Sequence, residues 1–402
     1  MARHIAVGID IGTYQVRVVV TSASTPAERI SPKIIGTGSA ESRGLRHGYI
    51  INQAEAVKSI RTAIRQAEKA AGVKITRAFL AIGGIGLSSI ISTGTIITSR
   101  ADSEITDLDV KKAQEVAEHE IPQTISINRR VLHPIPLEYK IDGKSVLGRP
   151  NNMKGMRLEA RMLFINCLSH HLDDLIEAVQ ECEVDVEDVM ASPLAASFVT
   201  LSKTQRIAGC VLANIGAETV SIVVFENDKA ISMEVFPIGS NDITNDIALG
   251  LKIPIEQAER IKIGLQNQAG GNKIQDFPRK KLDEIVGARL SDIFELIEAH
   301  LKKIGRNGLL PAGIIITGGG SSISTIEDLA KSSLKLPSKK PDVRFESAKG
   351  PIKDSGWAVA YGLCIVAFTT EEAEIIGMSP HLRHMVKNTK NSIWAWIKQF
   401  LP

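Results

Sequence analysis

DIGTYQVRVVV at residues 10–20 and NIGAETVSIVV at residues 214–224 are two copies of one pattern, held at a constant offset of 204 residues without a gap. Each copy follows an apolar run, turns through Ile-Gly, and resumes as a run rich in β-branched residues. Such runs on both sides of a tight, glycine-containing turn predict a β-hairpin. Because the hairpins stand at the heads of two half-chains, they predict a duplicated α/β domain with a cleft between the copies.

Outward from the first hairpin, the chain has the pattern of an α/β domain that is interrupted by an insertion. Residues 53–71 have helical apolar spacing, and residues 77–82 form an apolar run typical of a buried strand. The glycine-rich link GGIGLSS then leads into residues 95–150, where strand-like runs surround one charged helix near 107–120. We expect an inserted subdomain here, after which ARMLFINCL, at 160–168, is expected to resume the scaffold.

The second half has an insertion of its own. After the second hairpin comes a long helical region, 255–303, broken by the loop QAGGNKIQDFP. A buried strand, GIIIT, then runs into the glycine-rich segment TGGGSS at 317–322. Residues 334–353 are expected to form loop and edge structure, WAVAYGLCIVAF a tightly packed helix of small residues, and 371–390 a linker.

Composition places the chain among globular proteins of a reducing compartment. It has 402 residues, 44% of them hydrophobic and 23% charged, and a formal net charge of +3. No acidic residue follows Glu374, so the tail is basic and the body close to neutral, which gives no reason to expect nucleic-acid binding. The four cysteines form no CxxC pair, and no histidine stands at an interpretable spacing from a Ser or Cys nucleophile, so the histidines are expected to have structural roles.

The first hairpin turn, which carries Asp10, Gly12, Thr13 and Tyr14, is suited to a phosphate. Backbone amides of such a turn can converge on an anion, and Gly12 permits close approach. Thr13 can donate its hydroxyl, and Asp10 can orient water on a phosphate-bound Mg²⁺, an ion that keeps several waters. An ordinary hairpin with an Asp in its turn is the competing interpretation, and for this hairpin alone it is the better one.

Two further motifs have both a binding and a structural interpretation. The glycines of TGGGSS stand where a buried strand meets a helix, and there a flat nucleoside could lie against the backbone. Glu259 and Lys262, in AERIK, are three residues apart on one helix face and could hydrogen-bond ribose hydroxyls. In isolation, a glycine turn is common without a ligand, and such a Glu–Lys pair is more often a surface ion pair.

The order of these motifs is more specific than any one of them. Together, in this order, they resemble the actin, Hsp70 and sugar-kinase superfamily: hairpin, insertion, SPLAASF helix, second hairpin, AERIK helix, TGGGSS and small-residue helix. Within it, the chain resembles the FtsA family through GIDIGT at 8–13, RRVLHPIPLEYKIDG at 129–143, MKGMRLEARMLFINC at 153–167 and AERIKIG at 258–264. SPLAAS and WAVAYGL match the two helices that cross at the interdomain hinge of this superfamily, where Ala195, Ala196, Ala358 and Gly362 would allow a close crossing.

The resemblance implies an α/β, actin-like fold: two duplicated α/β domains around a nucleotide cleft, each with an inserted subdomain, plus a C-terminal amphipathic helix. The first domain is expected at 1–84, resuming at about 160–198 and 354–370, with its FtsA-type insertion at 85–159. The second domain is expected at 199–240, resuming at about 305–353, with its insertion at 241–304. The linker is expected at 371–390 and the terminal helix at 391–402.

The resemblance also implies ATP as the cofactor, with Mg²⁺ held by Asp10 through water. The residues expected at the cofactor are Asp10, Gly12, Thr13, Tyr14, Asn214, Gly216, Ala217, Gly239, Glu259, Lys262, Gly318, Gly319, Gly320 and Ser321. The implied partners are the C-terminal tail of the tubulin-like protein FtsZ, other division proteins, anionic lipid, and further copies in an actin-like polymer. The FtsZ tail is expected on the second insertion, where Arg279, Lys280, Lys281, Lys302 and Lys303 suit an acidic peptide. The implied location is the cytoplasmic side of the inner membrane, at the division site.

Three positions depart from the pattern of the family. Asn214 stands where an Asp is expected, Glu218 where a Gly is usual, and Ser192 where active relatives place a water-orienting Glu or Gln. Loss of a carboxylate near Mg²⁺ and of a general base slows hydrolysis, and Glu218 would add negative charge near phosphates. We therefore expect bound ATP and at most slow ATPase activity, with no confident catalytic residue.

The C-terminal segment SIWAWIKQFL, at residues 392–401, predicts a helix that lies in a membrane interface. One helix face would carry its large apolar residues, which are Ile393, Trp394, Trp396, Ile397, Phe400 and Leu401. Large aromatics with basic flanks and no acids are typical of such helices. The competing interpretation is a terminal helix docked on the protein's own core.

Two other functions share this fold. A sugar kinase or active ATPase would need an Asp base facing a sugar pocket, and the sequence offers no candidate in that context. A PilM-like protein of pilus assembly would share the fold and the insertion but would not need a lipid-inserting tail.

Overall fold

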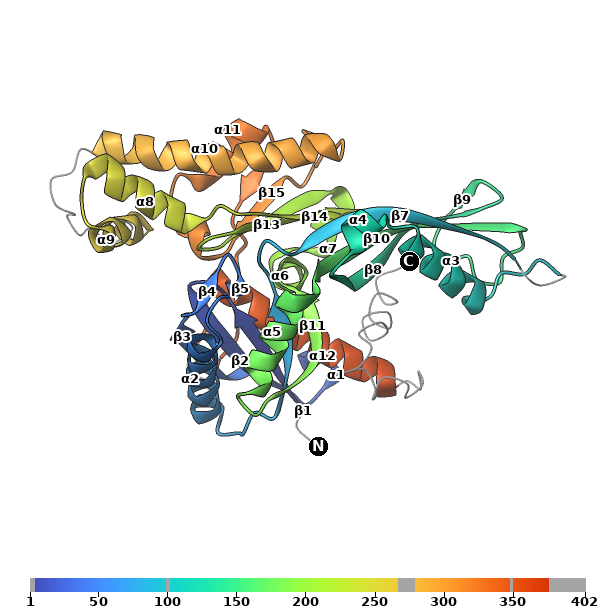
Figure 1. Ribbon diagram of the computed structural model, residues 1–402, viewed down its shortest axis with the longest axis horizontal. Coiled ribbons are helices and arrows are strands. Elements are labelled where there is room, and N and C mark those ends of the chain that lie inside the picture. The colour runs from blue at the N-terminus through green and yellow to red at the C-terminus, as the bar shows by residue number, and fades with distance from the viewer. Residues whose placement is uncertain (1–3, 99–101, 267–278, 348–349, 376–402) are drawn as a thin grey trace.

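The computed structural model describes residues 4–98, 102–266, 279–347 and 350–375, and it consists of two α/β halves with a smaller sheet projecting to one side (Figure 1). In the first half, five strands lie in the order β11-β6-β1-β2-β3. They are β1 (His4–Ile11), β2 (Gln15–Ala23), β3 (Lys33–Glu41), β6 (Arg77–Ile82) and β11 (Asp185–Ala191), with a two-stranded ribbon of β4 (Leu45–Arg46) and β5 (Tyr49–Ile50). Its helices are α1 (Pro26–Ile30), α2 (Gln53–Ala71), α5 (Ser169–Gln180), α6 (Ser192–Thr200) and α12 (Ala358–Ile375).

The second half repeats this sheet, with its strands in the order β16-β15-β12-β13-β14. They are β12 (Cys210–Ile215), β13 (Val220–Glu226), β14 (Lys229–Phe236), β15 (Ile314–Thr317) and β16 (Ser338–Lys339). Ile11 lies opposite Val16 in the first hairpin, and Ile215 lies opposite Val220 in the second, so the register repeats at the offset of 204. In both sheets the next neighbour of the first hairpin strand is a parallel strand. The predicted duplicated α/β domains are therefore confirmed.

Helix α2 shows how local sequence sets these elements. Asn52 caps its N-terminus by accepting a hydrogen bond from the amide of Glu55, and Gly72 ends it in the left-handed conformation, with φ 69°. Val57, Ile60 and Ile64 repeat at helical spacing and are buried against the first sheet. The helix begins and ends where the sequence pattern predicts.

The inserted subdomain of the first half is a four-stranded sheet in the order β7-β10-β8-β9. Its elements are β7 (Ser88–Ile97), α3 (Asp107–His119), α4 (Gln123–Ser126), β8 (Arg129–Ile141), β9 (Lys144–Val146) and β10 (Arg157–Leu168). ARMLFINCL lies in β10, which pairs along its length with β7 and β8, so the expectation that this strand resumes the scaffold is wrong. Met162 and Phe164 pack in the insertion's core, whereas Leu163 and Ile165 pack in the core of the first half. From Met162 to Ile165 both faces of the strand are buried, and this stretch is accordingly apolar.

The remaining helices belong mainly to the second half. They are α7 (Lys203–Ala208), α8 (Ser240–Leu251), α9 (Ile255–Gln266), α10 (Arg279–Lys303), the 3₁₀ turn η2 (Gly319–Ser322), α11 (Ile326–Leu334) and the turn η3 (Ser355–Trp357). Along α10, buried residues from Leu290 to Leu301 join the core of the second sheet. The predicted helical region is thus confirmed on either side of its loop, which lies outside the described residues.

Two boundaries differ from the sequence expectation. Val343 and Phe345, assigned to the second domain, are buried in the core of the first half, and the amide of Ile34 in β3 donates to the carbonyl of Glu346 at 2.9 Å. The chain has therefore crossed back to the first half before α12 begins. Helix α12 continues to Ile375, into the stretch expected to be a linker.

Helices α6 and α12 cross with backbone against backbone. A Cβ atom built at Gly362 of α12 would lie 2.0 Å from the carbonyl oxygen of Ala195 in α6. On its other side, α12 approaches β1 so closely that a Cβ at Gly8 would lie 2.1 Å from the carbonyl of Ala360. The predicted close crossing of small residues is confirmed.

Candidate functional site

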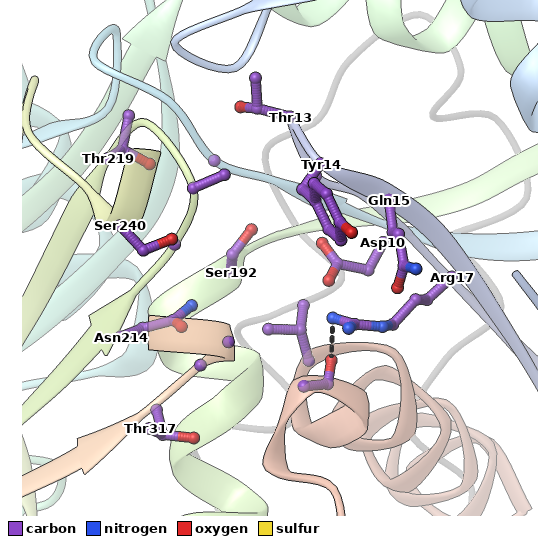
Figure 2. Close-up of a pocket in the computed structure, with 18 of the residues that line it drawn as sticks. Asp10, Thr13, Tyr14, Gln15, Arg17, Ser192, Asn214, Thr219, Ser240 and Thr317 are labelled. Carbon is purple, nitrogen blue, oxygen red and sulfur yellow. Dashed lines mark hydrogen bonds between the residues drawn. The ribbon is translucent and has the colours of Figure 1, made fainter. Parts of the chain in front are cut away.

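A cavity of about 470 Å³ lies between the two halves, within the size range of ligand pockets. Figure 2 shows Asp10, Tyr14 and Arg17 of the first half on one side and Asn214 and Thr219 of the second half on the other. Of the residues predicted at the cofactor, those that line it are Asp10, Gly12, Thr13, Tyr14, Asn214, Gly216, Ala217, Glu259, Lys262, Gly318 and Gly319. The structure thus brings residues from four separate motifs to one cavity.

Both hairpin turns are closed in the same way. The amide of Gly12 donates to the carbonyl of Gln15 at 3.1 Å, and the amide of Gly216 donates to the carbonyl of Thr219 at 2.8 Å. These two amides are therefore used within the turns, and an anion would have to bind to the other amides of the turns. Thr13, whose side chain lies at the end of the first turn, remains a lining residue.

Three of the predicted residues lie behind the lining. Gly239 precedes α8, and a Cβ there would lie 2.4 Å from the carbonyl of Ala217, so glycine lets the helix approach the second turn. Gly320 packs on Ile215, and the hydroxyl of Ser321 donates to the carbonyl of Gly318 at 2.7 Å. The 3₁₀ turn η2 directs both residues into the protein, which leaves Gly318 and Gly319 at the surface of the cavity.

Asp10 is the carboxylate that the first hairpin contributes. Burial raises its pKa from 3.8 to about 6, although the nearby Arg17 lowers it in part. Arg17 itself donates to the carbonyl of Gly356 at 2.8 Å, the dashed line in Figure 2, and lies 3.9 Å from the carboxylate of Asp354. The Arg17 guanidinium therefore binds mainly to the segment before α12, and it neutralises the charge of Asp10 only in part.

Lys262 and Glu259 form a network at the other end of the cavity. Lys262 is 3% exposed, and its ammonium lies 2.7 Å from the Glu259 carboxylate and donates to the Thr244 hydroxyl and the Ser240 carbonyl. The Thr244 hydroxyl in turn donates to Glu259 at 2.5 Å. A buried ammonium needs such partners to remain charged, so this is not the surface ion pair that the motif in isolation suggested.

Glu218 points away from the cavity. Its carboxylate accepts a hydrogen bond from the amide of His47 at 2.6 Å, and its carbonyl lies 3.1 Å from Nδ1 of the same His47. His47 has a positive φ of 49° in the turn between β4 and β5. The expectation of added negative charge near a phosphate is therefore corrected: Glu218 is not a lining residue, and it joins the second hairpin to the first half.

Several lining residues were not predicted from the sequence. They are Gln15, Arg17, Thr219, Ser221, Ser240, Asn241, Thr317, Ser322, Asp354 and Ser355, and Ser192, which was noted only as a departure, also lines the cavity. The repeat pairs Gln15 with Thr219 and Arg17 with Ser221, each 204 residues apart, so a prediction of either member would have pointed to the other. The hydroxyl of Thr317 is buried without a hydrogen-bond partner beside the cavity, which is a place where a ligand atom could bind.

A buried histidine–serine pair away from the cavity has the structural role that is expected of the histidines. Nε2 of His300 in α10 lies 2.8 Å from the hydroxyl of Ser232 in β14, and Nδ1 lies 3.8 Å from the carboxylate of Glu234. Burial lowers the pKa of His300 to about 4. Both residues of the hydrogen-bonded pair are buried, so the pair ties α10 to the sheet and is closed to a substrate.

Metal-binding clusters and membrane-spanning helices are both absent from the described part of the chain. There, no group of three or more His, Cys, Asp or Glu side chains is arranged to hold a metal ion. Helices of the length and apolarity required to cross a bilayer are likewise absent from those residues. Residues 391–402, with the predicted membrane helix, lie outside them.

Comparison with known proteins agrees with this architecture. Residues 211–362 match the family described as cell division protein FtsA, and residues 84–166 match the SHS2 domain inserted in FtsA. The cell division protein FtsA of Pseudomonas aeruginosa is 31% identical over 82% of this chain and 81% of its own length. That of Bacillus subtilis is 30% identical over 92% of this chain and 84% of its own.

Solved structures with this fold are more distant in sequence. The PilM–PilN type IV pilus biogenesis complex matches with a TM-score of 0.64 at 16% identity, over 90% of this chain and 97% of that one. MreB5 of Spiroplasma citri bound to ADP matches with a TM-score of 0.54 at 13% identity, over 93% and 99%. These likenesses show an actin-like fold. Together with the match to the SHS2 domain and the relatives at 30–31% identity, of which the chain covers more than four fifths, they establish that the chain belongs to the FtsA family of cell-division proteins.

Proposed function

We propose that the protein binds ATP with Mg²⁺ in the cavity between its halves. The observation that supports this most is the convergence of both hairpin turns, Gly318–Gly319 and the Glu259–Lys262 pair on one cavity. MreB5, which shares the fold, is described with ADP bound. A bound Mg²⁺ would supply positive charge beside the phosphates, and the incompletely neutralised Asp10 fits such a cation.

The lining residues favour binding over hydrolysis. Ser192, at the N-terminus of α6, offers a hydroxyl where hydrolysis would need a base, and Asn214 offers an amide where a second carboxylate would hold metal-bound water. Glu259 is already committed to Lys262 and Thr244. We therefore propose turnover well below about 1 s⁻¹, the lower end of ordinary enzyme rates.

Thermal unfolding with and without Mg²⁺–ATP tests the binding proposal. A ligand at a hundredfold excess over its Kd stabilises the folded state by about 2.7 kcal/mol, so the melting temperature should rise. GTP at the same concentration and ATP with EDTA serve as controls. An unchanged melting temperature at saturating Mg²⁺–ATP would contradict ATP binding. Phosphate release near or above about 1 s⁻¹ would contradict slow turnover.

We further propose that the protein is a division-site adaptor that tethers FtsZ to the inner face of the cytoplasmic membrane. Membership of the FtsA family supports this, together with the tail sequence SIWAWIKQFL. Burial of a large apolar side chain contributes about 1.5–3 kcal/mol, against about 1 kcal/mol or more of backbone entropy per ordered residue. One tail should thus bind reversibly, and an actin-like polymer would hold by presenting many tails at once.

Flotation with anionic liposomes tests the anchor. Trp396→Glu places a charge in the middle of the apolar face and should leave the protein in the soluble fraction, whereas Gln399→Glu, on the opposite face, should float like the parent. Equal flotation of Trp396→Glu and the parent would refute the anchor. It would also favour the PilM-like alternative, which the structural match to PilM keeps open.

The FtsZ tail is proposed to bind the second insertion, on its basic residues. Lys302 is engaged with Glu298 at 2.9 Å, so Lys280 and Lys281, at the exposed start of α10, are the better contacts for an acidic peptide. Lys280→Glu with Lys281→Glu should weaken binding of a labelled FtsZ tail peptide at least about tenfold. The matched control is Lys58→Glu with Lys69→Glu on α2, and equal loss in both variants would contradict the location.

A further inference from the structure

Strand β7 is an edge strand without the features that usually protect an edge. It lies at the border of the inserted sheet, and β10 is the strand with which its described residues pair (Figure 1). Its sequence SSIISTGTII has no charge and no proline, and its ladder with β10 runs from Ser88 to Ile97 without a register shift. Native edge strands are commonly blocked by Lys, by Pro or by a bulge. This edge is therefore built to accept another strand.

The register with β10 determines which backbone N–H and C=O groups of β7 point toward the open edge. The amide of Thr98 donates to the carbonyl of Met156 at 2.8 Å, so even-numbered residues direct their backbone groups toward β10. By antiparallel alternation, odd-numbered residues direct theirs outward. At the inner end, the Ser89 hydroxyl bonds both the amide and the carbonyl of Met233, which ends the edge there. The open stretch is 91–97.

The same odd-numbered residues expose their side chains. Ile91 is 41% exposed and Ile97 is 79% exposed, and Thr93 and Thr95 between them are also exposed. The opposite face is covered, because a Cβ at Gly94 would lie 2.1 Å from a backbone carbonyl of α3. Helix α3 thus holds the strand in place, and a further strand can add only along the edge.

The residues whose backbone groups point outward form a palindromic sequence, Ile-Thr-Thr-Ile. Ile91, Thr93, Thr95 and Ile97 are symmetric about Gly94. An antiparallel second copy therefore places Thr93 opposite Thr95 of the partner subunit and Ile91 opposite Ile97 of the partner subunit, in positions that exchange backbone hydrogen bonds. Thr–Thr and β-branched pairs are favourable cross-strand neighbours. A two-fold axis midway between the two opposing Gly94 residues, perpendicular to the sheet, relates the two copies.

We propose that two copies of this chain associate through β7 as a continuous, two-fold symmetric, eight-stranded sheet. A charged peptide would find no charged partner on the open edge, whereas a second copy matches it residue by residue. A two-fold contact of this kind closes at two copies, unlike a head-to-tail polymer. The cavity between the halves takes no part in it, so the association does not depend on nucleotide.

Disulfide trapping of the full-length protein tests the register. All four native cysteines are buried, which keeps background cross-linking low. Thr93→Cys with Thr95→Cys should form covalent dimers on mild oxidation, because these positions face each other across the axis. Ile91→Cys with Thr95→Cys is the matched control: its cysteines would be diagonal neighbours, about 7–8 Å apart, too far for a disulfide. Equal trapping of both pairs, or of neither, would overturn the register.

Sedimentation equilibrium tests the association itself. Thr93→Pro removes one outward amide and leaves the ladder with β10 intact, so it should weaken dimerisation at least about tenfold. Thr93→Val keeps the amide and should dimerise like the parent, both with and without Mg²⁺–ATP. Near-UV circular dichroism and melting temperature report whether Thr93→Pro is folded. A parent that stays monomeric at its highest soluble concentration, or a folded Thr93→Pro that dimerises equally, would overturn the proposal.

Discussion

Replacing Asp10 with Asn should stabilise the protein in the absence of ligand and weaken its response to Mg²⁺–ATP. Burial raises the Asp10 pKa from 3.8 to about 6, which corresponds to about 3 kcal/mol of unfavourable free energy for the ionised carboxylate. Asp10 keeps part of its surface open to the cavity, so about 1–3 kcal/mol is the expected gain in Asp10→Asn. Asn keeps the shape of the side chain and removes the charge.

The sign of the effect depends on pH in a defined way. Because the folded-state pKa is raised, the folded protein holds its proton more tightly, and the carboxylate is destabilising only where it is ionised. Its cost is near zero below the unfolded pKa of 3.8, grows as the pH rises toward 6, and is complete above that. The stability difference between variant and parent should therefore be largest at pH 8 and about half as large at pH 5.

Calorimetry of parent and variant at pH 8 and pH 5, without nucleotide, measures this difference. Asp185→Asn, at an exposed position of β11, is the matched control and should change stability by less than about 0.5 kcal/mol at both pH values. Addition of Mg²⁺–ATP at pH 8 should then raise the melting temperature of the parent more than that of Asp10→Asn. A variant that is less stable than the parent at both pH values would refute the reasoning, because Asp10 would then be a stabilising group.

Three further predictions concern the contacts around the cavity. Gly362→Ala should lower the melting temperature, because its Cβ would lie 2.0 Å from a carbonyl oxygen. A Cβ at Gly287 in α10 would have nothing within 4 Å, so Gly287→Ala should raise stability by about 0.5–1 kcal/mol. Equal shifts of the two melting temperatures would contradict the close crossing of α6 and α12. Lys262→Met should cost about 1–3 kcal/mol in urea unfolding, since it strips the partner from a buried hydrogen-bond network, and no loss would show that the network is dispensable. Glu218→Ala should speed hydrogen exchange at the His47 amide about tenfold or more, and unchanged exchange would place that protection elsewhere.

The sequence predicted the fold where local chemistry and the repeat agree. Glycine turns flanked by β-branched residues favour hairpins through local geometry, so the strands around 10–20 and 214–224 were placed correctly. The sequence could not assign ARMLFINCL to the inserted sheet rather than to the sheet of the first half. A strand stretch that is buried on both faces has the same apolar pattern in both sheets. The return of Val343 and Phe345 to the first half depends on long-range packing that leaves no local pattern.

For the site, the sequence predicted the motifs but not the pairings across the cleft. Glu218 appeared as a charge beside a phosphate, yet its partner His47 lies 171 residues away along the chain. Arg17 has the alternation of an ordinary strand residue, and only the return of the chain before α12 gives it a carbonyl to bind. In both cases the deciding neighbour is far away in the sequence.

The bare crossing of α6 and α12 limits how the cleft can open. With no side chain between Gly362 and Ala195, sliding one helix along the other would drive backbone atoms into flanking side chains, whereas turning one about the contact keeps the two backbones at the same separation. Helix α6 leads through α7 into β12 of the second half, so rotation about its contact with α12 would tilt the second half relative to the first. Small rotations there would become large displacements at the far ends of the molecule, where α10 and β7 lie (Figure 1).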